Sequence, residues 1–194
     1  MAKNSGHILR VSRFLLIGGG TGVAKTFEHL LRELADGEST LVVRDHAGAQ
    51  RLVRTIRPVL LRISSVRPGG NKEVVLVESR RVFRDGRDAT RSLSASIAEK
   101  RGNSETPESA ICRALAEELS VTFSAEELTT IIQLPPSRPR IGESTSFPGI
   151  LTELDELYYE LAMPKRHFRE QYIEEQEDKT TFFSWVPWDE RPWK

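Results

Sequence analysis

Acidic side chains gather around one arginine in residues 104–121, and their types and spacing suit the binding of a metal ion. Glu117 and Glu118 follow Arg113 by four and five positions, and Glu105 precedes it by eight. Carboxylate oxygens are the ligands that Mg²⁺ prefers, and a helix brings side chains three and four residues apart to one side. A divalent metal held in this way can bind a pyrophosphate and stabilise the charge on its oxygens during hydrolysis.

The residues around this cluster predict the helix that would position it. Thr106 is a favoured N-cap residue, and a proline such as Pro107 is favoured at the first helical position. Ile111 and Leu115 are four residues apart, so they would form the apolar face that packs on the core. The cluster also has a purely structural interpretation, because an arginine and a glutamate four residues apart form an ordinary ion pair on a helix.

The segment resembles the Nudix box, G-x5-E-x7-R-E-U-x-E-E-x-G-U, where U is a bulky aliphatic residue. With the arginine of the pattern placed on Arg113, its first glutamate falls on Glu105 and its paired glutamates fall on Glu117 and Glu118. The resemblance implies that Arg113 orients the acidic cluster, that Glu117 and Glu118 hold Mg²⁺ or Mn²⁺, and that Glu105 assists. No organic cofactor site is recognised in the sequence.

Three positions depart from the box. Its two glycines fall on Glu99 and Ser120, and the glutamate that follows the arginine is replaced by Ala114. That glutamate is a metal ligand in active Nudix hydrolases, so the resemblance leaves two functions open. The first is a metal-dependent hydrolase of a nucleoside diphosphate linked to another group, with weakened or lost activity. The second is a non-catalytic Nudix-like module that binds a nucleotide, RNA or a protein partner.

A further acidic residue after the box often completes a Nudix site. Glu153, Glu156 and Glu160 are the candidates in this chain, and the sequence does not separate them.

The pattern of apolar residues predicts an α/β fold of the Nudix type, an α/β/α sandwich with a mixed β-sheet, plus an N-terminal α/β extension. Residues 1–50 are assigned to the extension, which holds a Gly-rich segment and a helix over Lys25–Leu34, and residues 51–194 to the Nudix-like domain. The strands expected in the domain lie at residues 59–63, 74–77, 129–134, 157–161 and 182–186. The polar segment 167–176 is expected to be helical.

The Gly-rich segment from Gly18 to Thr26 is similar to a phosphate-binding loop. A P-loop requires G-x4-G-K-[S/T], and Ala24 stands where the second glycine is needed. We therefore interpret the segment as a flexible joint.

Composition limits the partners and the compartment. Basic and acidic residues both number 28, so net charge indicates neither nucleic acid nor membrane partners, although a local basic patch stays open. The single cysteine, Cys112, fits a reducing compartment, and no apolar run approaches the length of a membrane span. We expect a cytoplasmic protein with a nucleotide-like ligand. Organellar targeting stays open because the chain is free of acidic residues before Glu28, and a homodimer stays open because the C-terminal end is rich in aromatic residues.

Overall fold

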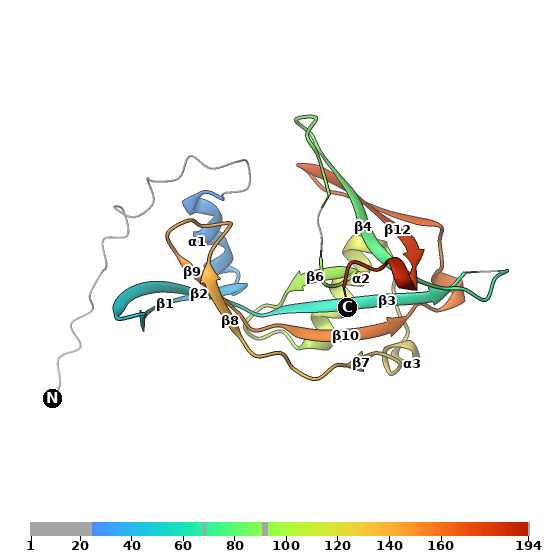
Figure 1. Cartoon of the computed structure of the whole chain (residues 1–194), viewed down its shortest axis with the longest axis horizontal. Coiled ribbons are helices and arrows are strands. Elements are labelled where there is room, and N and C mark those ends of the chain that lie inside the picture. The colour runs from blue at the N-terminus through green and yellow to red at the C-terminus, as the bar shows by residue number, and fades with distance from the viewer. Residues whose placement is uncertain (1–24, 68, 91–92, 194) are drawn as a thin grey trace.

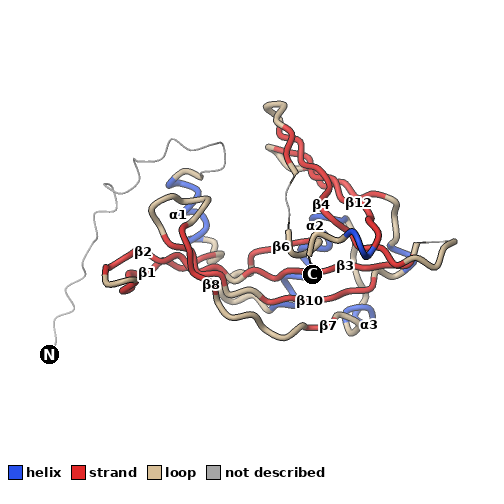
Figure 2. Tube along the Cα trace, in the orientation of Figure 1, coloured by secondary structure: helices blue, strands red, loops and turns tan. Residues whose placement is uncertain are grey.

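The computed structural model describes residues 25–67, 69–90 and 93–193, and these residues form two sheets with helices packed against them (Figure 1). Both sheets are mixed, with one parallel pair of strands in each among antiparallel neighbours. The predicted mixed α/β fold class is therefore confirmed. Strands make up most of the regular structure, with α1 beside the smaller sheet and α2 against the larger one (Figure 2).

The smaller sheet has the strand order β1-β2-β9-β8. Its strands are β1 (Ser39–His46), β2 (Ala49–Ile56), β8 (Arg140–Glu143) and β9 (Leu151–Leu154). Helix α1 (Phe27–Ala35) packs on it through a small apolar cluster in which Leu30, Phe147 and Ile150 are buried. The predicted division between residues 50 and 51 falls inside β2, and the position of the domain boundary stays a prediction.

The larger sheet has the order β11-β12-β4-β3-β10-β7, with β5 paired to β4 and β6 paired to β3. Its strands are β3 (Pro58–Val66), β4 (Glu73–Phe83), β5 (Asp88–Ala89), β6 (Ile97–Lys100), β7 (Ile132–Gln133), β10 (Leu157–Ala162), β11 (Gln171–Glu175) and β12 (Lys179–Pro187). Helix α2 (Pro107–Leu119) covers this sheet and, with it, encloses the main apolar core. Short helical turns complete the fold at α3 (Ala125–Leu128), η2 (Lys165–His167) and η3 (Trp188–Glu190).

Two expected elements differ from the sequence prediction. The segment 167–176 is not a helix, because only the turn η2 is helical and β11 follows it. Tyr172 is buried while Ile173 is exposed, so the strand alternates, and its pairing with β12 outweighs the helix preference of its glutamates and glutamine. The strand expected at 129–134 shortens to β7, because Ser124 caps the single helical turn α3 just before it.

The aromatic C-terminal end packs on this chain. Trp185 lies in the main core and stacks on Phe168 at 5.1 Å between ring centroids. Trp193 is buried, with the Arg62 guanidinium 5.9 Å from its ring centroid. A homodimer stays a prediction. The Gly-rich run from Gly18 to Ala24 lies outside the described residues.

Candidate functional site

Helix α2, the box helix, begins where the sequence predicts. The Thr106 hydroxyl accepts a hydrogen bond from the backbone N–H of Ser109 at 3.2 Å, and Pro107 opens the helix. The helix ends at Ser120, which adopts the left-handed conformation with φ of 53°. Only glycine adopts this conformation at no steric cost, and Ser120 occupies the place of the second glycine of the box.

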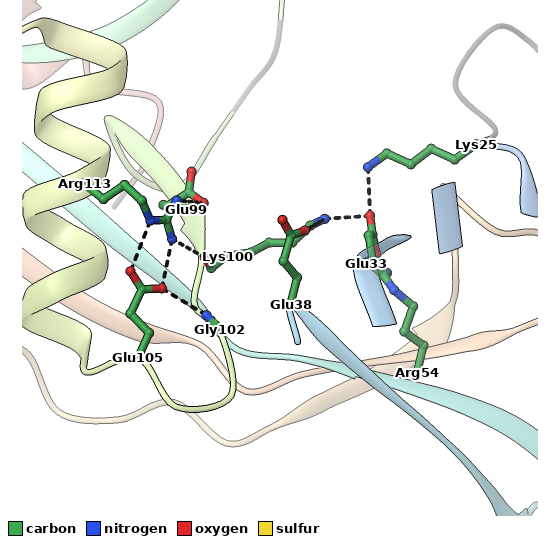
Figure 3. A network of polar contacts seen from close by, with 9 residues as sticks. All are labelled: Lys25, Glu33, Glu38, Arg54, Glu99, Lys100, Gly102, Glu105 and Arg113. Carbon is green, nitrogen blue, oxygen red and sulfur yellow. Dashed lines mark hydrogen bonds and ion pairs between the residues drawn. The ribbon is translucent and has the colours of Figure 1, made fainter. Parts of the chain in front are cut away.

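Arg113 clamps the loop that precedes the box helix. Its Nε and Nη2 donate to the two carboxylate oxygens of Glu105 at 3.1 and 2.9 Å, a bidentate arrangement (Figure 3). The same guanidinium donates through Nη1 to Glu99 at 2.8 Å and through Nη2 to the backbone carbonyl of Lys100 at 2.9 Å. Glu105 also accepts from the backbone N–H of Gly102 at 3.0 Å. The spacing of Glu105 and Arg113 therefore serves to fix the β6–α2 loop.

The two carboxylates that Arg113 contacts differ in their ionisation. The hydrogen bond from Arg113 is the main cause that holds the pKa of Glu105 below its usual value. Burial raises the pKa of Glu99, even though Arg113 donates to it, and the negative charge of Glu117 adds to the increase. Hydrogen bonding to Glu105 in turn raises the pKa of Arg113, so the guanidinium stays charged. Glu99, at the position where the box pattern has its first glycine, is thus held by Arg113.

Ala114 belongs to the buried face of the box helix. Its side chain is 1% exposed and lies in the main core with Ala110, Ile111 and Leu115. The residue that replaces the metal-binding glutamate therefore contributes to packing of the helix on the sheet.

Glu117 and Glu118 line a pocket of about 180 Å³ between the box helix and the larger sheet. Glu117 has a side chain that is 57% exposed, and one of its oxygens lies 3.7 Å from Nη1 of Arg113. The pocket is lined by Glu78, Arg81, Leu93, Ala98, Glu99, Glu117, Glu118, Glu174, Gln176, Lys179 and Thr181. We call it the box pocket. Its walls come from β4, β6, α2, β11 and β12, so it unites residues that are far apart in the sequence.

The further acidic residue in the box pocket is one that the sequence did not indicate. Glu174 from β11 lines the pocket, whereas Glu153 pairs with Arg44 at 2.9 Å on the smaller sheet. Glu156 accepts two hydrogen bonds from Arg140, and Glu160 lines a different pocket. The pairing of β11 with β12 places Glu174 there, and the segment 167–176 was expected to be a helix.

Three polar atoms at the wall of the box pocket are buried and have no hydrogen-bond partner. They are Oε1 of Glu78, Nε of Arg81 and Oγ1 of Thr181. The other carboxylate oxygen of Glu78 accepts from Arg81 at 2.9 Å, and the Glu78 side chain is only 4% exposed. A buried polar group without a partner costs free energy, so such groups are seldom left unpaired without a reason.

The carboxylates of the box pocket do not converge as a metal site requires. Mg²⁺ demands near-octahedral oxygen ligands at about 2.1 Å. Among the described residues, no three histidine, cysteine, aspartate or glutamate side chains are grouped closely enough to hold a metal ion. The metal roles of Glu117 and Glu118 therefore stay predictions.

A second charged network joins the box to α1 (Figure 3). The buried carboxylate of Glu33 accepts from Lys25 at 2.8 Å, from Lys100 at 2.6 Å and from Arg54. Burial alone would raise the pKa of Glu33, but the hydrogen bonds from Lys100 and Lys25 bring it down to about 2. Lys100 also donates to Glu38 at 2.9 Å. Its backbone carbonyl is the one that Arg113 contacts, so Lys100 belongs to both networks.

Comparison with known proteins finds similarity at the level of structure alone. No family model matches the chain, and no curated protein matches it. The solved structures that it is similar to include a C. elegans Ap4A hydrolase at 12% identity, covering 69% of this chain and 80% of that one, with a TM-score of 0.35. They also include a MutT/nudix family protein from Enterococcus faecalis at 14% identity, covering 84% of this chain and 51% of that one, with a TM-score of 0.40. A third is the M. smegmatis Nudix hydrolase RenU at 18% identity, covering 80% and 86%, with a TM-score of 0.31.

The arginine–glutamate clamp at the spacing of the box and the mixed sheet that carries the box helix both agree with the resemblance seen in the sequence. At these identities and TM-scores, the neighbours say nothing about what this chain binds or whether it is an enzyme. No helix in the part of the chain that the structure describes has the length and apolar character to cross a bilayer.

Proposed function

We propose that this protein is a Nudix-like binding module, in which the box helix holds the fold together and the box pocket takes a polar ligand without cleaving it. The observation that carries the proposal is the use made of the box residues. Arg113 and Glu105 are bonded to each other and to the β6–α2 loop, and Ala114 is packed in the core. Three of the positions that serve catalysis in the family therefore serve structure in this chain.

The pocket supports binding because it is polar and its walls hold buried groups without partners. Glu78 and Thr181 each present an oxygen that a ligand could bond. The predicted nucleotide-like ligand would bring phosphates next to five glutamates, with Arg81 and Lys179 as the only basic residues among the pocket-lining side chains of the described chain. Such a ligand would have to arrive with a cation.

A second candidate function is weak metal-dependent hydrolysis. It is favoured by one observation, which is that Glu117, Glu118 and Glu174 line the same pocket from two elements. This function requires that these side chains come together when a ligand binds. In that case Glu117 and Glu118 would be the metal ligands, as the sequence predicts, and Glu174 would be a third.

Hydrolysis assays separate the two functions. Nucleoside triphosphates, a nucleoside diphosphate sugar and a dinucleoside polyphosphate would be incubated with the full chain and Mg²⁺ or Mn²⁺, and released phosphate and nucleotide measured. We expect no release above that of buffer. Hydrolysis by the unmodified chain that is lost in both Glu117→Gln and Glu118→Gln would overturn the proposed function and establish the second candidate.

A further inference from the structure

The charge of the box pocket indicates which ligands it can take. Five glutamates line it, from β4, β6, α2 and β11, against the basic residues Arg81 and Lys179. Arg81 is already committed to Glu78, to which its Nη2 donates at 2.9 Å. Arg113 offsets part of the remaining negative charge, because it donates to Glu99 at 2.8 Å and lies 3.7 Å from Glu117, and an excess of negative charge remains among the described residues. A pocket with this balance repels phosphate and carboxylate groups and attracts positive charge.

The spacing of the carboxylates in the box pocket favours an organic cation over a metal ion as the ligand. A metal needs several oxygens within about 2 to 2.6 Å of one point, and no three acidic or histidine side chains in the described chain are grouped in that way. A guanidinium or ammonium group instead spreads three to five N–H donors over a few ångströms. Carboxylate acceptors that lie apart on different elements therefore suit a guanidinium or ammonium group better than they suit a metal ion.

The buried wall of the pocket provides a specific acceptor. Oε1 of Glu78 has no hydrogen-bond partner, and the side chain is 4% exposed. Oγ1 of Thr181, on the neighbouring strand β12, also lacks a partner in a residue that is 1% exposed. Because β4 and β12 are paired neighbours in the sheet, a donor would reach these atoms from the pocket that both residues line, after a shift of side chains. This removes the free-energy cost of leaving them unpaired.

Size and lining agree with a ligand of this kind. The volume of about 180 Å³ accommodates an alkyl chain with a charged head and is small for a nucleotide. Among the described residues that line it, Leu93 and Ala98 are apolar and none is aromatic, so these residues offer a nucleobase no ring on which to stack.

We propose that the box pocket binds an alkylammonium or alkylguanidinium group, held by the carboxylates of Glu78, Glu118 and Glu174. The inference rests on the proposed function, since it names the ligand class of the same pocket. Two sources carry this chemistry, a free amine such as a polyamine and an arginine or lysine side chain of a peptide.

Calorimetric titration of the full chain with agmatine at low ionic strength tests the inference, with a short arginine-containing peptide, blocked at both ends, as a second arm. We expect agmatine to bind, and Glu174→Gln and Glu118→Gln each to weaken binding by about tenfold, since each removes a charge-assisted hydrogen bond. Glu175→Gln is the matched control, because it removes the same charge from an exposed residue of β11 outside the pocket and should leave the affinity unchanged.

Each outcome of these titrations either supports the inference or overturns it. Stronger binding of the peptide than of agmatine identifies a side chain as the source, and the reverse identifies a free amine. Absence of binding in both arms overturns the inference, as does binding that both pocket variants leave unchanged. Nucleotide binding without cation binding overturns the ligand class and leaves the binding module standing. Nucleotide hydrolysis overturns the proposed function. The titration with agmatine then still decides whether the pocket binds an organic cation.

Discussion

Lys100 and Arg113 are joined through the backbone, because Nη2 of Arg113 donates to the Lys100 carbonyl oxygen at 2.9 Å. The side chain of the same lysine donates to Glu33 of α1 at 2.6 Å. The conformation that the box imposes on residue 100 thus also sets where its ammonium group meets α1. In this chain the box arginine contributes to the attachment of the N-terminal helix as well as to the loop before α2.

We expect Arg113→Lys to destabilise the fold by about 2 kcal/mol, because a lysine cannot form the bidentate pair with Glu105 and also reach Glu99 and the backbone. Chemical denaturation followed by tryptophan fluorescence measures the change. Glu117→Gln is the control, since its exposed carboxylate is 3.7 Å from Arg113 and such pairs contribute less than about 1 kcal/mol. Equal effects of the two variants would contradict the clamp.

Restoring the missing glutamate should damage the fold before it restores chemistry. Ala114 is 1% exposed in the core, so Ala114→Glu would bury a charge without a partner and cost about 3 kcal/mol or more. Ala116→Glu adds the same side chain on the exposed face of α2 and should change stability by less than about 0.5 kcal/mol. Thermal unfolding of both variants, with and without Mn²⁺, is the measurement. An Ala114→Glu protein as stable as the unmodified chain would show that position 114 opens into the box pocket.

Local signals in the sequence predicted the box helix well. Thr106 and Pro107 mark its start, because capping depends on residues that are neighbours in the chain. The strands β3, β4, β10 and β12 likewise follow from short apolar runs.

The composition of the box pocket was not predictable in the same way. Glu78 and Glu174 are separated by almost a hundred residues, and they meet because β12 pairs with both β4 and β11. Long-range pairing of this kind leaves no local pattern, and the polar sequence of β11 by itself favours a helix. Resemblance to the box predicts that Arg113 orients the acidic cluster and that Glu105 assists, and these roles stay predictions, whereas the hydrogen bonds between the two residues, which join the loop to the helix, are seen only in the structure.

Acid should weaken the attachment of α1 through Glu33. Its pKa is lowered from 4.5 to about 2 in the folded protein, so the stabilising effect of its ionised form is fully present above pH 4.5. That effect is lost as the pH falls through about 2, because the folded carboxylate then takes up its proton.

The difference in unfolding free energy between the unmodified chain and Glu33→Gln measures this contribution. We expect it to be on the order of 2 kcal/mol at pH 7 and to shrink steadily between pH 4.5 and 2. Glu38→Gln is the control, because Glu38 also accepts from Lys100 but its side chain is 39% exposed, and its difference should be small at every pH. A Glu33→Gln difference that does not depend on pH would contradict the assignment.

Glycine at position 120 should stabilise the protein. Ser120 has φ of 53° and ψ of 44°, where its Cβ crowds the backbone, and this conformation costs a non-glycine residue about 1 to 2 kcal/mol. Ser120→Gly relieves that cost, partly offset by the greater freedom of glycine in the unfolded chain, so we expect a gain of about 0.5 to 1 kcal/mol. Ala116→Gly lies inside α2 at an exposed position, where glycine is unfavourable, and should instead destabilise by about 1 kcal/mol. If the C-cap of the box helix is strained, urea unfolding of the two variants gives changes in the free energy of unfolding that have opposite signs. A loss of stability in both would mean that the Ser120 side chain contributes more than its backbone conformation costs.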